Sequence, residues 1–210
     1  MILGMDTCGP VGTLALAQLD GDRICLRGEA EIAGKTYSAM LMPRIRELLD
    51  ANGIGVHEIT AIVVVNGPGS FTGVRVGLSA VKGLVEALGI PVIAVSRLAV
   101  LAQKGGVKFA ALDAGRGEFY FGDYADGQHE ALLSVEEVRS ACPEREIAIC
   151  EDRVALALPE ARVVGAPTAT DALRFGLPKL LTQDFDDAVM LDGNYLRRAD
   201  AEVKMGALKR

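Results

Sequence analysis

The sequence predicts an α/β protein made of two halves that repeat the same order of elements. Apolar runs typical of buried strands alternate with segments whose apolar residues recur at helical spacing. The first half opens with a strand, an aspartate, a turn of small residues, a second strand and an Asp-Gly turn (LGMD, TCGPVG, TLALAQL, DG). After a linker at residues 104–106, the second half opens in the same order (AALD, AGRG, EFYFGDYA, DG), which is the pattern of a duplicated domain.

The first half begins with three predicted strands before any helix. MILGMD is a buried strand that ends in Asp6, VGTLALAQL follows the turn TCGP, and RICLRGEA follows the hairpin turn at residues 20–22. SAMLMPRIRELLDANG has helical spacing, and Pro43 either kinks this helix or lies in its first turn. The strand AIVVV, a helix from about Thr72 to Leu88, the strand IPVIAVS and a helix capped by Ser96 complete this half.

The second half mixes strands and helices in a similar way. KFAALD is a strand that ends in Asp113, and EFYFGDY, EIAIC and ARVVG are further strands. Ser134 and Glu137 form a capping box for the helix VEEVRSA, and TDALRFGLPKLL is a helix interrupted near Pro178. The polar end, NYLRRADAEVKMGALKR, is expected to fray. We therefore predict an N-terminal lobe at residues 1–103 and a reduced C-terminal lobe at residues 107–210.

Two similar halves, each with an aspartate at its first turn, suggest the actin-like ATPase architecture, a ribonuclease H-like fold. This likeness implies two lobes of mixed sheet flanked by helices, a nucleotide cleft between them, and opening aspartates that help to hold a metal–phosphate group. The aspartates can equally be turn residues that bond their own backbone. The second half lacks the late Gly-Gly turn of actin-like kinases, because its glycines after Cys150 stand singly.

The loop NGPGSFTGVRVG, residues 66–77, resembles a phosphate loop but fits none of the standard motifs. A Walker A loop needs Lys and then Ser or Thr after its last glycine, where this loop has Val74 and Arg75. Its glycines are spaced one residue too far for a dinucleotide fingerprint, and the residues around Ser70 do not make a hydrolase elbow. A helix start can still attract an anion. The residues of a vestigial phosphate site would be Asp6, Thr7, Ser70, Thr72 and Asp113.

The helix after this loop has a face of small side chains. Gly73, Gly77 and Ala80 are spaced to lie on one side, where another backbone can come close. This face either packs within its own lobe or contacts another chain. In the second case the preceding helix adds apolar residues to the same surface. The predicted partner interface then consists of Leu41, Ile45, Leu48, Leu49, Gly73, Gly77, Ala80 and Leu84.

Composition and charge narrow the classes of function. Half of the residues are apolar and 24% are charged, which excludes a disordered chain. The net charge of −6 argues against a protein that binds nucleic acid alone, although the end of the chain is locally basic. No apolar run approaches the roughly 18 residues of a membrane span. The four cysteines and two histidines have no metal-ligand spacing, so we expect reduced thiols, no metal, no cofactor and a cytoplasmic location.

Four segments give a more specific likeness. MILGMDTCGPVGTLAL, NGPGSFTGVRVGLSAVKGL, LDAGRGEFYFGDY and NYLRR occur in this order, and with them the chain resembles the TsaB (YeaZ) family, bacterial subunits of tRNA threonylcarbamoyladenosine biosynthesis. Gly115 stands where arginine is frequent in the family, and Tyr37 stands where many relatives have a histidine. The resemblance is weakest from about Pro143 to Asp192.

The resemblance implies a non-catalytic paralogue of TsaD, the enzyme that transfers threonylcarbamoyl to adenosine 37 of tRNAs reading codons that begin with A. Members of the family pair with TsaD through helices of the N-terminal lobe, and TsaE, an ATPase, docks on the pair. We therefore expect a scaffold and activator with a TsaD-like partner and a TsaE-like ATPase. We also expect a homodimer when alone, tRNA contact only through the complex, and no membrane. Two other classes remain open: an actin-like small-molecule kinase or ATPase, and a glycoprotease-like peptidase.

Overall fold

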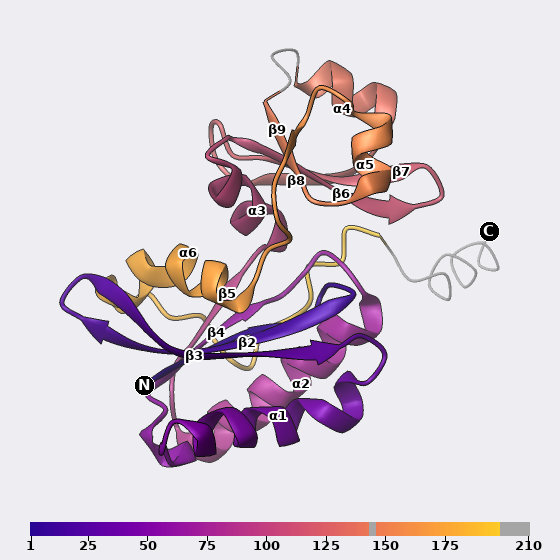
Figure 1. The fold of residues 1–210 in the computed structure, drawn as a ribbon. Helices are drawn as coiled ribbons and strands as arrows, with labels where there is room; N and C mark the ends of the chain where they lie inside the picture. Colours follow the sequence, from indigo (N-terminus) through magenta and orange to yellow (C-terminus); the bar gives the residue numbers. More distant parts are fainter. Residues whose placement is uncertain (143–145, 198–210) are drawn as a thin grey trace, which may run out of the picture.

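Two five-stranded mixed sheets with the same topology form the framework of the molecule (Figure 1). The computed structural model describes residues 1–142 and 146–197. In the first sheet, β2 pairs antiparallel with β1 and β3, whereas β4 runs parallel to both β1 and β5. The strand order is β3-β2-β1-β4-β5. The strands are β1 (Ile2–Asp6), β2 (Val11–Asp20), β3 (Arg23–Ala33), β4 (Ala61–Val65) and β5 (Val92–Val95).

The second sheet repeats this arrangement strand for strand. Its order, read from the antiparallel edge, is β8-β7-β6-β9-β10, again with two antiparallel pairs followed by two parallel pairs. The strands are β6 (Phe109–Gly115), β7 (Glu118–Asp123), β8 (His129–Ser134), β9 (Ile147–Ile149) and β10 (Arg162–Val163). The predicted α/β fold with two duplicated lobes is therefore confirmed.

Strand β8 was not predicted. It is the edge strand of the second sheet, and its sequence HEALLS contains no β-branched or aromatic residue. None of its side chains is fully buried, so its sequence does not show the alternation of apolar and polar residues by which a strand is usually predicted.

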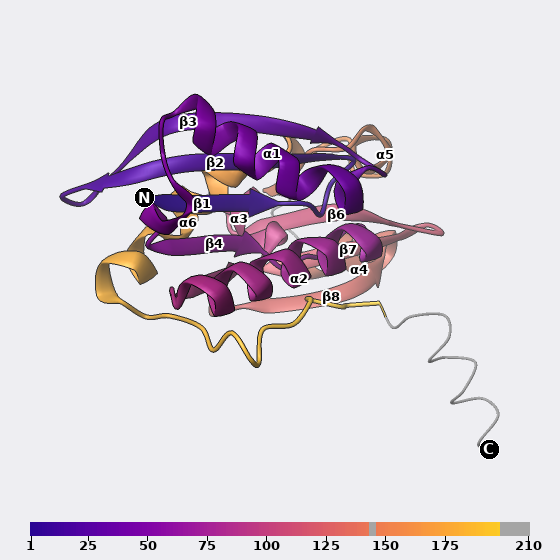
Figure 2. The ribbon, with the colours of Figure 1, turned by 90° about the horizontal axis from the view of Figure 1, so that it is seen from below.

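Two pairs of helices cover the outer faces of the sheets. Helices α1 (Tyr37–Ala51) and α2 (Phe71–Leu88) lie side by side against the first sheet (Figure 2). Their counterparts on the second sheet are α4 (Val135–Ala141) and α5 (Asp152–Ala157). The first pair has 15 and 18 residues and the second pair only 7 and 6, so the second lobe is the reduced one. A short 3-10 helix, Val56–Glu58, precedes β4.

The remaining helices, α3 (Arg97–Gly105) and α6 (Ala169–Thr182), lie between the sheets and are exchanged between the lobes. Helix α3 follows the last strand of the first sheet but packs on β6, β7 and β9. Helix α6 follows the last strand of the second sheet but packs on β1, β4 and β5, and the two helices also contact each other. A boundary at residues 103–107 therefore separates the two sheets but not the two cores.

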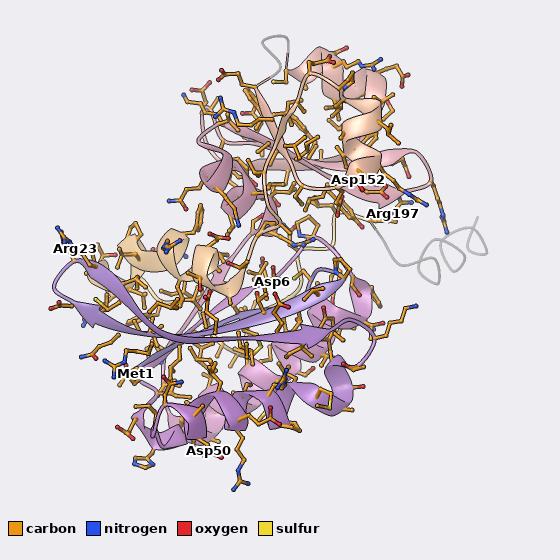
Figure 3. The ribbon with its side chains drawn as sticks, in the orientation of Figure 1. Met1, Asp6, Arg23, Asp50, Asp152 and Arg197 are labelled. Carbon is orange, nitrogen blue, oxygen red and sulfur yellow. The ribbon has the colours of Figure 1, made fainter. Side chains whose placement is uncertain are left out.

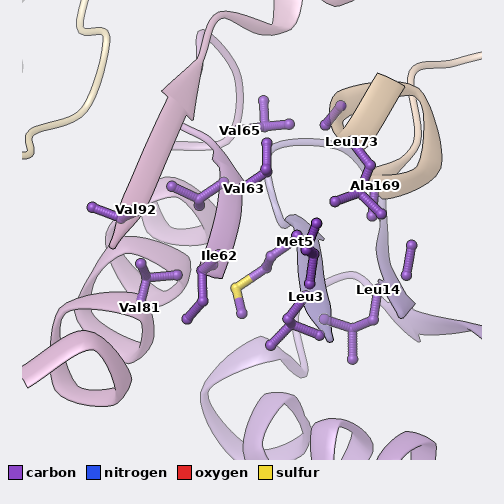
Figure 4. Close-up of a cluster of buried hydrophobic side chains, with 14 of the residues drawn as sticks. Leu3, Met5, Leu14, Ile62, Val63, Val65, Val81, Val92, Ala169 and Leu173 are labelled. Atoms are coloured by element: carbon purple, nitrogen blue, oxygen red, sulfur yellow. The ribbon is translucent and has the colours of Figure 1, made fainter. Parts of the chain in front are cut away.

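The exchange is visible in the packing of apolar side chains. Ala169 and Leu173 of α6 belong to the same buried cluster as Val63 and Val65 of β4 (Figure 4). Leu98 and Leu101 of α3, together with Ala102, are buried with Ala110 and Leu112 of β6. Each sheet is thus covered on its inner face by a helix whose sequence belongs to the other half of the chain.

The helix boundaries follow the expected capping chemistry. The side chain of Ser70 accepts the N–H of Gly73, and Ser96 and the Ser134–Glu137 capping box act in the same way at their helices. The predicted interruption near Pro178 is wrong, because α6 continues through Pro178 to Thr182. Proline removes one backbone donor, and burial of Leu173 and Leu180 on the first sheet holds the helix together. Pro43 lies inside α1, beyond its first turn.

The segment after α6 runs back along the first lobe. The carboxylate of Asp186 accepts the N–H of Ala94 at 2.8 Å, and the N–H of Asn194 donates to the carbonyl of Asn66 at 2.8 Å. The predicted fraying of the chain end falls largely on residues 198–210, which lie outside the described residues. None of the helices in the described part of the chain combines the length and apolarity needed to cross a bilayer.

Candidate functional site

Two adjoining cavities lie between the lobes. The turn cavity, of about 540 Å³, borders the turns that follow β1 and β6, and the aromatic cavity, of about 450 Å³, borders the start of α2 and residues 194–197. Both are lined by Gly69, Ala114, Gly115 and Tyr120, so they form one continuous cleft. The residues that distinguish the turn cavity are Cys8, Gly9, Arg97, Asp113 and Glu151. Those that distinguish the aromatic cavity are Phe71, Arg116, Tyr195 and Arg197.

A buried ion pair stands at the first turn. Asp6 ends β1 where the first lobe meets the second (Figure 3), and one of its carboxylate oxygens is 3.6 Å from Nε of Arg97. The two side chains are 2% and 4% exposed, so each charge depends on the other for compensation. Burial alone would lower the pKa of Arg97, but its charge interactions with Asp6, Cys8, Cys150 and Glu151 together outweigh this, and the pKa lies above its ordinary value. The guanidinium is therefore a permanent cation at this position.

The actin-like architecture implies a metal–phosphate group beside these turns, and the residues of the turn cavity do not fit one. The guanidinium lies so close to the turn that a Cβ atom added at Gly9 would be 2.6 Å from its Nη2. This fixed cation takes the place that a metal ion would need beside Asp6, and it repels a second cation there. Within residues 1–142 and 146–197, no cluster of three histidine, cysteine or acidic side chains could hold a metal ion.

The second turn has the same local geometry in a more open environment. Oδ1 of Asp113 accepts the N–H of Gly115 at 2.8 Å, as Oδ1 of Asp6 accepts the N–H two residues on at 2.7 Å. Both aspartates therefore bond their own turn, as one of the two interpretations of the sequence expects. The other carboxylate oxygen of Asp113 is 3.7 Å from Nη1 of Arg153, whose side chain is 81% exposed. Glu151 accepts the backbone N–H of Asp113 at 2.5 Å, and burial raises the pKa of Glu151.

The loop before α2 ties the first turn to that helix. The N–H of Ser70 donates to the carbonyl of Cys8 at 2.8 Å, and the N–H of Arg97 donates to the carbonyl of Gly67 at 2.7 Å. A Cβ atom at Gly69 would lie 2.4 Å from the same Cys8 oxygen, so only glycine permits this approach. The glycines of the loop therefore serve close packing of backbone on backbone.

The predicted phosphate-site residues are only partly brought together. Ser70 and Asp113 line the turn cavity, and Asp6 lies buried next to it. Thr7 is also buried, and its hydroxyl donates to a backbone carbonyl of α2 at 2.7 Å. Thr72 is exposed and lines neither cavity, because it lies on the outward side of the first turn of α2.

The predicted partner interface needs a correction for its apolar residues. The spacing that suggested them is the spacing that directs them onto the first sheet, so they belong to the core of their own lobe. The residues buried in this way, between 2% and 9% exposed, are Leu41, Ile45, Leu48, Leu49 and Leu84.

The face of small residues is also occupied from within. A Cβ atom at Gly73 would lie 2.0 Å from the carbonyl oxygen of Thr7, and one at Gly77 would lie 2.2 Å from the Thr7 hydroxyl oxygen. These glycines let α2 approach the first turn. Of the two interpretations of this face, packing within its own lobe therefore applies to Gly73 and Gly77. Ala80 is half-buried and lies further along, in a shallow groove of about 350 Å³. This α1–α2 groove is lined by Tyr37, Ser38, Leu41, Met42, Arg75, Val76, Ser79 and Ala80.

Sequence reasoning missed Arg97 and the aromatic pair Phe71 and Tyr195. Arg97 did leave a signal, since a cation in the first turn of a helix opposes the helix dipole and therefore needs a nearby carboxylate. The aromatic pair left none, because its members are far apart in the chain and meet only through the segment that follows α6.

Comparisons with known proteins agree with this architecture. The family model described as TsaD, tRNA N6-adenosine threonylcarbamoyltransferase, matches residues 30–203. Proteins named tRNA threonylcarbamoyladenosine biosynthesis protein TsaB are 35% identical to this chain in both Haemophilus influenzae and Bacillus subtilis. These alignments cover 57% of this chain and 52% of the first relative, and 67% of this chain and 62% of the second. The chain thus spans between half and two thirds of the length of these curated relatives.

A solved structure extends the likeness to both lobes. It comes from Pseudomonas aeruginosa, is described as similar to the peptidase YeaZ, and has a TM-score of 0.76 at 28% sequence identity. The match covers 93% of this chain and 99% of that chain. Together with the family match over most of the sequence, it shows that the chain belongs to the TsaD family, tRNA N6-adenosine threonylcarbamoyltransferase, and within it is similar to the proteins named TsaB and YeaZ.

Proposed function

We propose that the chain is a non-catalytic subunit required for threonylcarbamoyl transfer to adenosine 37 of tRNAs that read ANN codons. In this role it is the scaffold and activator of a TsaD-like catalytic subunit. The observation that carries the proposal is the buried pair of Asp6 and Arg97 at the first turn. An actin-like enzyme needs this turn for metal and phosphate, whereas here an internal cation takes the position. The relatives named TsaB support the pathway.

The α1–α2 groove is the surface that we propose for the partner. Met40 and Met42 of α1 are 38% and 48% exposed at or beside it, and flexible methionine side chains adapt to irregular partner surfaces. The small residues Ser79 and Ala80 of α2 allow a partner helix to come close. A TsaD-like subunit occupies the groove in the complex, and a second copy occupies it when the chain is alone. A TsaE-like ATPase then docks on the pair.

tRNA contact through the complex, in the cytoplasm, is part of the same proposal. The net charge of −6 disfavours strong binding of tRNA by the chain alone near physiological salt. The basic residues expected to add phosphate contacts are Arg197, Arg198, Lys204, Lys209 and Arg210, and all but Arg197 lie outside the described residues.

A peptidase has little support in the cleft. Burial raises the pKa of the Cys8 thiol well above its ordinary value, so this thiol is not an activated nucleophile. Ser70 accepts the N–H of Gly73 at 3.2 Å as a helix cap. Tyr37 donates its hydroxyl to the carbonyl of Gly9 at 2.7 Å, and burial raises its pKa to about 12. A kinase is disfavoured by the same ion pair that carries the scaffold proposal.

The test is reconstitution of the modification on unmodified tRNA. A TsaD-like subunit, a TsaE-like ATPase, ATP and threonylcarbamoyl-adenylate are combined with and without this chain, and the modified nucleoside is measured by mass spectrometry. We expect product only when the chain is present, and neither product nor ATP hydrolysis from the chain alone. The proposal is contradicted if the chain alone hydrolyses ATP or forms the modified nucleoside, and if this activity co-purifies with the protein in further purification steps.

Matched substitutions test the proposed surface. Met42→Asp in the α1–α2 groove should abolish association with the TsaD-like subunit, measured by light scattering after size-exclusion chromatography. Val163→Asp is the control, because Val163 is a 64% exposed apolar residue on β10 of the other lobe. Equal association by both variants would remove the groove from the proposal.

A further inference from the structure

The aromatic cavity carries two rings that the scaffold role does not use. Phe71 at the start of α2 and Tyr195 after α6 have ring centroids 5.2 Å apart at an interplanar angle of 49°. They are 40% and 36% exposed, in a chain with only 5% aromatic residues. The Arg75 guanidinium lies 3.9 Å from the Phe71 centroid and 5.9 Å from the Tyr195 centroid. Arg75 covers one face of Phe71, so the stacking surface of the two rings is the side that they present to the cavity.

Positive charge borders the same cavity. Its described lining contains Arg116 and Arg197 and no carboxylate, although the chain as a whole carries −6. Arg197 donates to Glu118 at 2.6 Å and to the carbonyl of Gly115 at 3.3 Å, which fixes its guanidinium at the turn between β6 and β7 and offsets part of its charge. Its Nε is buried and finds no acceptor among the described residues. The first turn of α2 adds the positive end of a helix 18 residues long.

The backbone that presents Arg116 is unusual. Arg116 has a φ of 60°, between Gly115 at 73° and Gly117 at 78°, so three successive residues lie in the left-handed region. A residue with a side chain is rarely found there, and such conformations concentrate at binding sites and catalytic sites. The turn between β6 and β7 therefore places an arginine at the cavity at a cost in backbone energy.

We propose that the aromatic cavity binds a nucleoside phosphate. The base stacks on Phe71 and Tyr195, and the phosphate is bound by Arg116 and Arg197 without a metal ion, since guanidinium groups match phosphate oxygens in charge and geometry. The volume of about 450 Å³ is within the usual range for small-ligand sites. The actin-like fold implies a metal–phosphate group in the turn cavity, and Arg97 excludes such a group there. The proposed site in the aromatic cavity is therefore a different site.

Arg75 connects this cavity to the partner surface. It stacks on Phe71 in the aromatic cavity and also lines the α1–α2 groove. The bound group would therefore lie beside the proposed TsaD-like partner. The base and the phosphate can belong to a free mononucleotide or to an unpaired nucleotide of RNA. RNA as the source of the ligand rests on the proposed function in tRNA modification.

The experiment titrates the purified full chain by calorimetry with four probes at low salt. The probes are AMP, adenosine, ribose 5-phosphate and a five-nucleotide single-stranded RNA. We expect saturable binding of AMP, weakened on the order of tenfold when either the base or the phosphate is missing. Phe71→Leu should weaken AMP binding by a similar factor, and Tyr195→Leu is a second variant in case Phe71→Leu reduces folding. Phe185→Leu is the matched control, because Phe185 is 39% exposed and lines neither cavity.

Each result decides for or against the site. Absence of saturable binding of both AMP and the RNA overturns the proposal, as does binding that Phe71→Leu and Tyr195→Leu leave unchanged while both remain folded. Equal binding of ribose 5-phosphate and AMP overturns the stacking role. RNA binding tighter than AMP, and sensitive to Phe71→Leu, identifies RNA as the source, whereas AMP binding alone identifies a free nucleotide. Failure of the reconstituted tRNA modification leaves these binding results unaffected, so the two proposals fail separately.

Discussion

The two opening turns share their backbone and differ in what surrounds them. Asp6 ends β1 and Asp113 lies two residues before the end of β6, and each accepts the N–H two residues further on, at 2.7 Å and 2.8 Å. Asp6 is buried and faces the buried Arg97, whereas Asp113 is half-buried and faces the exposed Arg153. The duplicated pattern therefore specifies the turn, and the helix that reaches it decides whether the carboxylate is enclosed or open.

The first turn is enclosed because residues from both lobes hold it. The arginine comes from α3, which packs with the second sheet, so the first turn is occupied by a residue held by both lobes. The enclosed turn is further fixed by Tyr37, Thr7 and Ser70 through hydrogen bonds to the backbone. The first turn is therefore part of the core, while the neighbouring part of the cleft stays open.

The largest effect should come from filling the space between α2 and the first turn. Gly77→Leu places a branched side chain where even a Cβ atom would lie 2.2 Å from the Thr7 hydroxyl oxygen. Overpacking of a core costs about 1–3 kcal/mol and occasionally more, and a contact this short belongs to the exceptional cases, so we expect a loss of more than about 5 kcal/mol. Urea denaturation followed by circular dichroism measures it.

The control for this substitution is on the same helix. Gly83 has nothing within 4 Å of an added Cβ atom, so Gly83→Ala should raise the free energy of unfolding by about 0.5–1 kcal/mol. A Gly77→Leu variant as stable as the unmodified chain would show that the face of small residues is free after all, and would return it to the partner surface.

The ion pairs give the next effect and compare the two turns directly. Asp6→Asn leaves the Arg97 cation buried without a counter-charge, and we expect a loss of about 3–5 kcal/mol. Asp113→Asn keeps the acceptor for Gly115 and loses only a pair with an exposed arginine, so we expect less than about 1 kcal/mol. Adding Arg97→Met to Asp6→Asn should recover most of the loss. Equal losses at the two aspartates in urea denaturation would refute the contrast.

The smallest effect is a dependence of stability on pH. Burial raises the folded-state pKa of Glu151 above its ordinary value of 4.5. Above pH 4.5 and up to the raised pKa, the folded protein holds a proton that the unfolded chain has lost, so its contribution to stability falls as pH rises through this window. Glu151→Gln should remove this decline in a series of thermal melts, and an unchanged slope would contradict it.

Glu137 offers the opposite sign for comparison. Hydrogen bonds from the backbone and side chain of Ser134 lower the pKa of this exposed carboxylate below 4.5. Its contribution to stability is present above pH 4.5 and is lost as pH falls through the lowered pKa. Glu137→Gln should therefore remove part of the decline on the acid side only.

Much of the fold could be predicted from the sequence because its signals are local. Helix caps at Ser96 and Ser134, the Asp-Gly hairpins and the repeated strand–Asp–turn opening each depend on neighbouring residues, and the structure contains them. Edge strand β8 and the continuity of α6 through Pro178 depend on tertiary packing, and both were missed. An amphipathic pattern gives the apolar face of a helix without saying whether a sheet or another chain covers it, which is why Leu41 and Leu49 were assigned to a partner.

The candidate site was less predictable than the fold. Asp6 and Asp113 could be located because the duplicated pattern marks them. Arg97 could not be paired with Asp6, since the two residues meet only when α3 crosses to the other lobe. The contact between Phe71 and Tyr195 depends in the same way on the path of the segment after α6.

The exchange of α3 and α6 links the order of synthesis to the order of folding. When residues 1–105 have left the ribosome, α1 and α2 can cover one face of the first sheet, but the other face lacks its helix until Thr182 has emerged. Until then Val63 and Ile93, which α6 contacts at Gly176, face water or a chaperone. The nascent first lobe is thus an incomplete folding unit for most of translation. A chain truncated before α6 would lack part of the first core and the contact between α3 and α6.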